Sequence, residues 1–205
     1  MTLLTPVLSA RVAATPDDIQ RVFALRAAVF MTEQFCPYDE EFDGNDFCAT
    51  HILGLVNEEP AAVLRVRYFA NFAKIERLAV LARFRRTMVA KLVVETGIEI
   101  CRKKGYTALY GQAQKRLVKF WSRFGFHPLH KDTALVFSDH EYVEIAAELV
   151  PHPDPITPMS DPYLIIRPEG RWEEAGVLDR SASRAPTNPQ ADRTFERVKQ
   201  PAIEN

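Results

Sequence analysis

The stretch IERLAVLARFRRTMVAKLVVE, residues 75–95, joins three kinds of local pattern. Residues 75–80 are typical of a β-strand, a short basic loop follows, and apolar side chains then recur at helical spacing. Strand-to-helix junctions often bind phosphate on the free N–H groups that begin the helix, and their loops are usually rich in glycine. Here Arg83, Arg85 and Arg86 occupy the loop, which contains no glycine. The stretch is therefore either a phosphate site built with arginines or only a connection.

The strand in this stretch changes phase. Ile75 falls on one parity of the alternation, whereas Leu78 and Val80 fall on the other. Because side chains along a strand alternate between its two faces, a slip of one residue indicates a β-bulge. The helix beyond the loop is expected from about Arg86 to Lys104, since cations occupy its last turn and Gly105 suits the position after it.

Outward from this centre, strand patterns and helix patterns alternate along the chain. Thr15 suits the N-cap of an early helix and Pro16 its first position. Helices are expected from residue 16 to about 31–37, at 86–104 and at 115–125, where Gly125 stops the last one. Strands are expected at 7–13, 47–56, 60–69, 73–80 and 106–114 and twice within 127–150, with turns at NEEP (57–60) and SDHE (138–141). The order β-α-β-β-β-α-β-α-β-β predicts an α/β (α+β) fold with a largely antiparallel sheet.

The composition changes after Val150. The run PHPDPITPMSDP (151–162) is rich in proline, and YLIIRPEG (163–170) is expected to add an edge strand at most. We therefore expect one domain over residues 1–150 and a Pro-rich extension over 151–205 that is partly mobile, above all from about Gly176 onward. The YLII segment could also join two chains in a homodimer, although nothing in the sequence requires it.

Overall composition excludes several classes of protein. With 47% hydrophobic residues, 26% charged residues and a net charge of −1, the chain gives no reason to expect a nucleic-acid partner. Its three cysteines form no CxxC pair, which argues against a disulfide framework and a structural zinc site. We expect no signal peptide and no membrane helix, because no apolar run approaches the roughly 20 residues that a span needs. A cytoplasmic protein without a metal is the expectation.

Three segments together resemble the GNAT N-acetyltransferase superfamily: LRAAVFMTEQ (25–34), IERLAVLARFRRTMVAKLV (75–93) and GYTALYGQAQ with LVKFWSRFGF (105–126). The ending FWSRFGF is similar to the family pattern F-Y-x-x-x-G-F. The resemblance covers about residues 7–149. It implies a sheet whose central strands splay apart to admit acyl-CoA, with a bulge on the fourth strand.

The resemblance also implies a set of residues that bind acetyl-CoA as co-substrate. The family's pyrophosphate motif has Arg or Gln, two free positions, Gly, one free position, and then Gly or Ala. Residues 85–90 match it at the first and last positions, and Met88 stands where the first glycine is usual. Backbone groups of the bulged strand would hold the pantetheine arm like an added strand. The implied binding residues are Leu78, Ala79, Val80, Arg85, Arg86, Thr87, Met88, Val89, Ala90, Gln114 and Phe120.

Acyl transfer to an amine needs a base, because an amine with a pKa of about 10.4 is protonated at neutral pH. We favour Glu76, on the bulged strand where the superfamily often places a carboxylate; pairing with Arg65, Arg67 or Arg77 is its structural alternative. Glu33 is the second candidate, and a solvent-exposed helix end is the alternative for it. His51 titrates in the right range, although a lone strand histidine is more often structural.

The acid is the more dispensable partner, because a thiolate whose conjugate thiol has a pKa of about 8.5 leaves readily. Trp121 occupies the position where many relatives place a tyrosine acid, and an indole N–H cannot serve as one. Either the thiolate leaves unaided, another group donates, or the chain only binds acyl-CoA. The acidic run DEEFDGND (39–46) fits an EF-hand loop poorly, because Thr50 stands at its twelfth position. It could instead attract a cationic acceptor or simply be solvated.

The first hypothesis is an acyl-CoA-dependent N-acyltransferase that acetylates the primary amine of a small molecule by direct transfer in a ternary complex. The second is a long-chain acyltransferase, because LRAAVFMTEQ, DEEFDGND and LRVRYF loosely resemble acyl-homoserine-lactone synthases. The third is a non-catalytic acyl-CoA-binding module, which Met88 and Trp121 favour. A protein or peptide acceptor also stays open.

Overall fold

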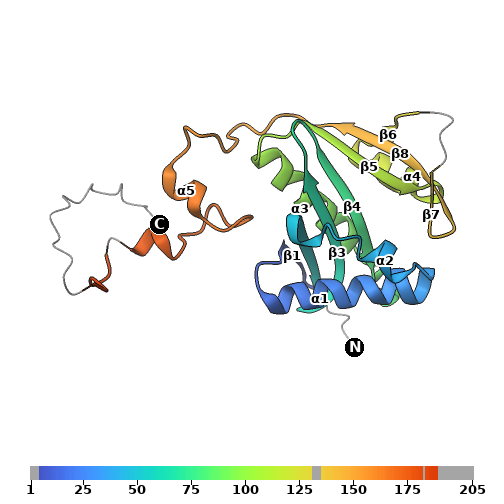
Figure 1. The fold of residues 1–205 in the computed structure, drawn as a ribbon, viewed down its shortest axis with the longest axis horizontal. Coiled ribbons are helices and arrows are strands. Elements are labelled where there is room, and N and C mark those ends of the chain that lie inside the picture. Colours follow the sequence, from blue (N-terminus) through green and yellow to red (C-terminus); the bar gives the residue numbers. More distant parts are fainter. Residues whose placement is uncertain (1–4, 131–134, 182, 189–205) are drawn as a thin grey trace. The chain divides into compact units, whose positions relative to one another are not determined.

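A mixed sheet organises the first of the chain's two units, Met1–Met159 and Ser160–Asn205 (Figure 1). The computed structural model describes residues 5–130, 135–181 and 183–188. Within those residues the sheet has eight strands in the order β1-β2-β3-β4-β5-β8-β6, and β7 also pairs with β8. Every pairing is antiparallel except that of β4 with β5. The predicted fold class, a largely antiparallel sheet flanked by helices, is confirmed.

The elements follow the sequence patterns closely. The strands are β1 (Leu8–Val12), β2 (Thr50–Val56), β3 (Glu59–Tyr68), β4 (Ala73–Val80), β5 (Ala108–Gln114), β6 (His127–Pro128), β7 (Leu135–Phe137) and β8 (His140–Glu148). The α-helices of the first unit are α1 (Pro16–Arg26), α2 (Tyr38–Glu41), α3 (Val89–Lys103) and α4 (Val118–Trp121). A π-helix, Ala27–Glu33, continues α1. Short 3₁₀ turns lie at Asp46–Cys48, Ala82–Phe84, Lys115–Leu117 and Ser122–Phe124.

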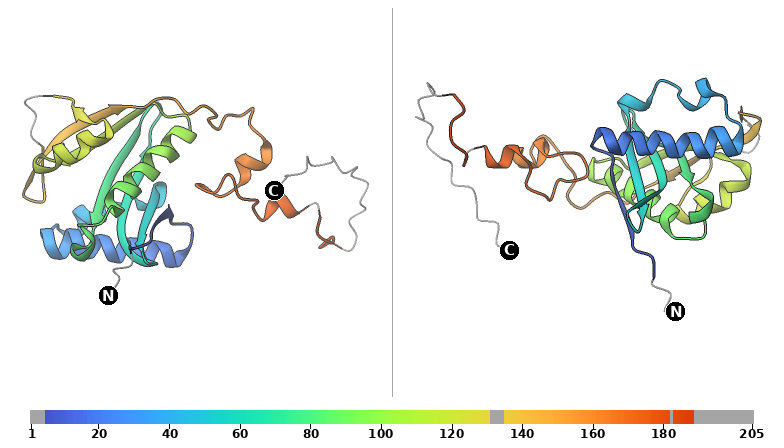
Figure 2. Two further views of the ribbon diagram at one scale, coloured as in Figure 1. Left: turned by 180° about the vertical axis from the view of Figure 1, so that it is seen from behind. Right: turned by 90° about the horizontal axis from the view of Figure 1, so that it is seen from below.

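Helices α1 and α3 cover opposite faces of the sheet (Figure 2). On the α1 face, Val22 and Leu25 pack with Leu53 and Val63 in a buried apolar cluster. On the other face, α3 approaches β2 so closely that a Cβ at Gly54 would lie 2.4 Å from a methyl group of Val93. Burial of each such side chain contributes about 1.5–3 kcal/mol, so both faces of the central strands stabilise the fold.

The predicted bulge lies on β4. Val63 pairs with Ala79 and Arg65 pairs with Glu76, so β4 holds one residue more than β3 between these two pairs. Arg77 lies in the left-handed region with φ 53°. The extra residue moves every later side chain of β4 to the other parity, which is the phase slip seen in the sequence.

Strands β4 and β5 form a fork. They pair only from Ala73 to Ile75 on β4 and from Leu109 to Gly111 on β5. Beyond these residues β4 continues to Val80 and β5 to Gln114 without pairing to each other. At the branch point a Cβ on Gly111 would lie 3.1 Å from the carbonyl oxygen of Ile75, so the close approach there favours glycine. The implied splay of the central strands is thus present.

Two predicted boundaries were wrong. Helix α3 begins at Val89 and not at Arg86, because residues 85–88 form turns in which the Thr87 hydroxyl donates to the Phe84 carbonyl and accepts from the Val89 N–H. Strand β2 begins at Thr50 and not at Phe47, whose ring is 94% exposed in a 3₁₀ turn. In both cases local hydrogen bonds overrode the apolar pattern.

The first unit extends past residue 150 along the end of α3. The Ile156 N–H donates to the Lys103 carbonyl at 2.7 Å, and Lys103 Nζ lies 3.0 Å from Asp154 Oδ2. Arg102 Nε also donates to the Val150 carbonyl at 2.8 Å. These contacts hold the proline-rich residues 150–156 to the body of the unit.

In the second unit the YLII segment is helical, so the predicted edge strand was wrong. Helix α5 (Pro162–Ile166) has Pro162 at its first position, and the Asp161 side chain accepts from the Tyr163 N–H at 2.9 Å. This Asp-Pro start overrides the strand preference of the two isoleucines. Arg167 then forms a 2.8 Å ion pair with Asp179. The sequence also predicts a mobile segment from about Gly176 onward. Residues 182 and 189–205 of that segment lie outside the described residues.

Candidate active site

A cavity of about 510 Å³ lies in the region where β4 and β5 separate. The end of the π-helix, the α2 segment, α4 and the β7–β8 hairpin complete its wall. Its lining comprises Phe30, Gln34, Cys36, Glu40, Glu41, Asp43, Asn45, Arg67, Lys74, Ile75, Glu76, Arg77, Leu78, Gln112, Ala113, Gln114, Arg116, Leu117, Trp121, Val136, Phe137, Ser138 and Tyr142. Residues far apart in the sequence therefore converge on the mouth of the fork.

Beyond Ile75, the edge of β4 that faces β5 pairs with no strand formed by the described residues. Leu78 lines the cavity, while Ala79 and Val80 pair with β3 on their other side. Unpaired N–H and C=O groups on an exposed edge can bind an extended guest by adding it as a strand. The structure thus offers the pantetheine arm of CoA the kind of edge that the resemblance implies, although the Arg85 Nε donates to the Val80 carbonyl at 3.1 Å.

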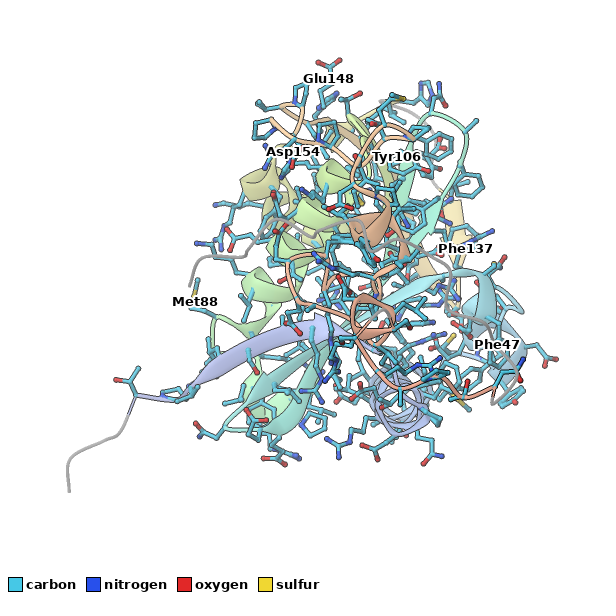
Figure 3. All side chains as sticks on the ribbon, turned by 90° about the vertical axis from the view of Figure 1, so that its left-hand side faces the viewer. Phe47, Met88, Tyr106, Phe137, Glu148 and Asp154 are labelled. Carbon is cyan, nitrogen blue, oxygen red and sulfur yellow. The ribbon has the colours of Figure 1, made fainter. Side chains whose placement is uncertain are left out.

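The basic loop lies at the start of α3. Arg85 forms an ion pair with Glu33, Arg83 forms one with Glu59, and Arg86 is exposed. Met88 is the N-cap of α3 and is 58% exposed, and Figure 3 shows its side chain pointing away from the body of the unit. Because Met88 does not cover the helix start, the N–H groups of the first turn remain a suitable place for an anion.

Glu76 lines the cavity from β4 and is bound by cations on both carboxylate oxygens. Arg65 Nε donates to Oε1 at 3.0 Å, and Lys74 Nζ lies 2.7 Å from Oε2. Arg67 is more distant, with its Nη1 3.9 Å from Glu76 Oε1. The expected pairing with arginines is therefore present, together with one to Lys74 that sequence analysis missed. Glu33 is one-third exposed, bound to Arg85 and absent from the cavity lining.

Two arginines are fully buried behind the cavity. Arg26 donates to Glu41 Oε1 at 2.5 Å and to Asp46, while Arg65 donates to Asp43 at 2.6 and 2.8 Å and to Asp46 at 2.8 Å. Burial alone would raise the pKa of Asp43, but the hydrogen bonds and charge of Arg65 outweigh it and hold that pKa well below its usual range. Sequence analysis missed this network, because nothing local pairs residues 26 and 65 with 41–46.

Arg77 ties the bulge to the acidic loop. Its Nη2 donates to the Glu40 carbonyl at 2.5 Å and lies 3.3 Å from Asp43 Oδ2, and its Nε lies 3.3 Å from Glu41 Oε2. The left-handed backbone of Arg77 directs the side chain there. Arginines thus bind Glu41, Asp43 and Asp46 of the acidic loop, whereas the Glu40 carboxylate lines the cavity and accepts from Ser138. Within the described residues no group of three or more His, Cys, Asp or Glu could hold a metal ion.

His51 belongs to the same buried region. Its Nε2 lies 3.0 Å from the Asp46 carbonyl, and its Nδ1 is buried with no hydrogen-bond partner in the part of the chain that the structure describes. Burial lowers the pKa of His51, and the nearby positive charge of Arg26 adds to this. A neutral imidazole that donates from Nε2 satisfies this geometry. His51 is therefore placed as a structural residue, since it does not line the cavity.

Gln114 and Trp121 line the far side of the fork, and Phe120 does not. The Phe120 ring instead contacts the rings of Trp121 and Phe124 at 5.3 Å between centroids. Gln114 donates from Nε2 to Gln34 Oε1 at 2.9 Å and to the Tyr142 hydroxyl at 3.3 Å. Sequence analysis missed Gln34 and Tyr142. The turn at SDHE, which joins β7 to β8, was the only signal near Tyr142, and it does not indicate the pairing of β8 with β5.

This forked sheet with a bulged strand, a basic helix start and a cavity between the separated strands defines an acyltransferase. The chain belongs to the acetyltransferase (GNAT) family, whose model matches residues 19–126. The chain is similar to protein ElaA of Escherichia coli K12, with 33% identity over 119 residues that cover 55% of this chain and 77% of ElaA. The crystal structure of E. coli ElaA aligns with a TM-score of 0.62 and 26% identity, covering 70% of this chain and 100% of that one.

Two further similarities extend this result. The uncharacterized N-acetyltransferase YjcF of Bacillus subtilis is 25% identical over 145 residues, which cover 71% of this chain and 96% of YjcF. A GNAT family acetyltransferase from Elizabethkingia anophelis, crystallised with acetyl-CoA bound, shares the fold with a TM-score of 0.53 and 14% identity, over 70% of this chain and 98% of that one. Among the described residues, no helix is both long enough and apolar enough to cross a membrane.

Proposed function

We propose that this acyltransferase moves an acyl group, in the first place acetyl, from acyl-CoA to the primary amine of a small molecule. The observation that carries the proposal is the fork, in which an unpaired edge of β4 borders a cavity that also holds Glu76. Acyl-CoA supplies an activated carbonyl and a thiolate leaving group. The amine acceptor would enter from the side of α2 and the β7–β8 hairpin, so that both substrates are bound together and transfer is direct.

Glu76 is our proposed base. Since both of its oxygens accept from cations, a water molecule in the cavity is the better route for the proton than direct contact with the amine. The cations around it keep the carboxylate in place without covering it, because the Glu76 side chain remains 10% exposed. Glu33 is the second candidate base, and its ion pair with Arg85 places it next to the proposed pyrophosphate site rather than in the cavity.

The proposed CoA site uses residues from both arms of the fork. Leu78, Ala79 and Val80 would receive the pantetheine arm, and residues Arg85 to Ala90 the pyrophosphate at the start of α3. Arg85 and Arg86 would add charge-assisted bonds, which are about twice as strong as neutral ones. Gln114 borders the arm from β5.

A donor with a longer acyl chain is a second candidate. Its specific support is the apolar part of the cavity wall, formed by Phe30, Leu78, Leu117, Trp121, Val136 and Phe137. A wall of this kind would favour each added methylene by about 0.8 kcal/mol. The same cavity is also large enough for an acetyl group. The preferred length of the acyl chain is therefore to be measured with acyl-CoAs of increasing length.

The test combines binding and turnover. Titration of the protein with CoA and with acyl-CoAs of increasing length should raise the melting temperature, because ligand binding to the native state adds RT ln(1 + [L]/Kd) to its stability. CoA release should then require both an acyl-CoA and an amine from a broad panel. Tight binding without release across the panel would favour the non-catalytic module, and no effect of any acyl-CoA on melting would overturn the proposal.

A further inference from the structure

Three polar side chains meet across the cavity. Gln34 comes from the end of the π-helix, Gln114 from β5 and Tyr142 from β8, and all three line the cavity. Gln114 and Tyr142 are direct partners in the β5–β8 register, so their side chains lie on the same face of the sheet. Gln114 Nε2 donates to Gln34 Oε1 at 2.9 Å and to the Tyr142 hydroxyl oxygen at 3.3 Å.

Gln114 is 6% exposed, and its Oε1 is buried without a hydrogen-bond partner among the described residues. A buried polar atom that forms no hydrogen bond costs about 1–3 kcal/mol. Because this atom is buried, a ligand cannot reach it while Gln114 keeps this conformation. The hydrogen bonds from Nε2 to Gln34 and Tyr142 are therefore what hold the Gln114 amide in the cavity wall.

The Tyr142 hydroxyl accepts from Gln114, so its own proton must point elsewhere. No described residue accepts that proton. Tyr110, on the same face of the sheet, differs: its hydroxyl donates to Glu144 at 2.6 Å. Burial, followed by this bond to Glu144, raises the pKa of Tyr110 to about 12. Of these two tyrosines, only Tyr142 lines the cavity and has a proton to donate into it.

Trp121 lines the same cavity and is 7% exposed. Its indole N–H is a hydrogen-bond donor but not an acid. Its ring is fixed in the core, with Phe126 at 5.4 Å between ring centroids. Two aromatic residues of the cavity wall therefore differ in chemistry. Trp121 cannot act as an acid, whereas Tyr142 on β8 carries a hydroxyl that can.

We propose that Tyr142 is the catalytic acid that protonates the departing sulfur, an inference that rests on the proposed acyl transfer. The amine nitrogen bonds to the carbonyl carbon, and the carbon–sulfur bond breaks with its electron pair left on sulfur. Sulfur takes the Tyr142 hydroxyl proton, and the proton lost by nitrogen passes to Glu76 through water. Tyr142 regains a proton and Glu76 releases one to solvent, so the cycle closes. Gln114 is the positioning residue that orients the hydroxyl.

The first measurement compares Y142F with the matched control Y110F, which removes a hydroxyl from the same face of the sheet. A positioned general acid contributes about 10²–10⁴-fold, and an easy leaving group places the effect at the low end. We expect kcat of Y142F to fall about 100-fold with the acetyl-CoA KM nearly unchanged, and Y110F to retain its kcat.

A binding measurement tests the same contact without turnover. Calorimetry with CoA and with desulfo-CoA reports how much affinity the sulfur adds. A Tyr142 hydroxyl that contacts sulfur should make the wild type prefer CoA to desulfo-CoA at pH 8–9, and Y142F should lose this preference while Y110F keeps it. The Phe137 ring contact with Tyr142 at 5.3 Å persists in Y142F, which favours a folded variant, and its melting temperature verifies this.

The outcomes separate the two proposals. If the wild type binds no acyl-CoA, or releases no CoA with any amine, the proposed function fails. If the wild type turns over and Y142F keeps both its kcat and its preference for CoA over desulfo-CoA, the assignment of Tyr142 is overturned. If W121Y restores turnover to Y142F, a phenol on either wall can perform the step, which supports the role assigned to Tyr142.

Discussion

Arg85 and Glu33 form an ion pair although they lie 52 positions apart in the sequence. The pair joins the loop proposed to hold pyrophosphate to the end of the π-helix that borders the cavity. Sequence analysis placed these residues in different roles, one in binding and one in catalysis. Their contact means that phosphate bound by Arg85 must compete with Glu33, so a substitution at either residue should affect CoA binding.

The loop arginines provide the first prediction. The R85A/R86A variant should raise the Kd for CoA at least about tenfold, because charge-assisted hydrogen bonds contribute about 1.5–3 kcal/mol each. E33Q should bind CoA no more weakly than the wild type, since it releases Arg85. Calorimetric titration gives all three values. R83A is the matched control, because Arg83 pairs with Glu59, and an R85A/R86A affinity equal to that of R83A would contradict the prediction.

The second prediction concerns the base. E76Q should lower turnover at saturating acyl-CoA by about 10²-fold or more, because the amide cannot take up the amine's proton. The melting temperature of the variant must be recorded as well, since Arg65 and Lys74 lose an anionic partner. E33Q should retain most of its turnover. Full turnover of E76Q would remove Glu76 as the base, and a loss in E33Q alone would transfer the role to Glu33.

Arg26 provides a prediction about stability. Its side chain is fully buried between Glu41 and Asp46, and removal of one partner from a buried ion pair costs about 3–5 kcal/mol. R26A should therefore lower the free energy of unfolding in urea by about this amount. R21A is the control, since the Arg21–Asp17 pair is exposed and contributes about 0–1 kcal/mol. Equal midpoints for the two variants would show that the network adds little.

His51 predicts how stability depends on pH. Its pKa is lowered in the folded protein by burial, so between the folded and unfolded values the unfolded chain binds more protons. The free energy of unfolding should therefore fall as the pH drops below about 6.5, the unfolded value. Urea unfolding from pH 7.5 to 5 measures the slope. H51Q should reduce it, and a slope unchanged by H51Q would assign the effect to other groups.

The carboxylates bound to Arg26 and Arg65 affect the free energy of unfolding at a lower pH than His51 does. The pKa of Asp46 is lowered because hydrogen bonds from Arg26 and Arg65 outweigh the opposing effect of burial. A depressed folded pKa adds stability above the unfolded value and loses it as the pH falls through the folded one. Acid unfolding of D46N should therefore be less steep below about pH 4 than that of the wild type, although D46N is less stable at pH 7. Parallel curves would contradict this.

Local chemistry was sufficient to predict much of the fold. The phase slip between Ile75 and Leu78 predicted the bulge at Arg77, because alternation along a strand is a property of neighbouring residues. Gly105 and Gly125 end their helical segments with φ 88° and 85°, which glycine adopts without steric cost. The prediction of an edge strand at YLII was wrong for a related reason. The Asp161–Pro162 helix start, also a local signal, outweighed the preference of the two isoleucines for a strand.

By itself the sequence determined the order of the elements, the bulge and the basic helix start, because each depends on residues within a few positions of one another. Only the tertiary structure decided that Arg26 and Arg65 bind carboxylates of the acidic loop, that Glu33 binds Arg85, and that Gln114 meets Gln34 and Tyr142 from 80 and 28 positions away. Such contacts depend on how the sheet brings distant strands together. No periodicity records which distant side chains will then face one cavity.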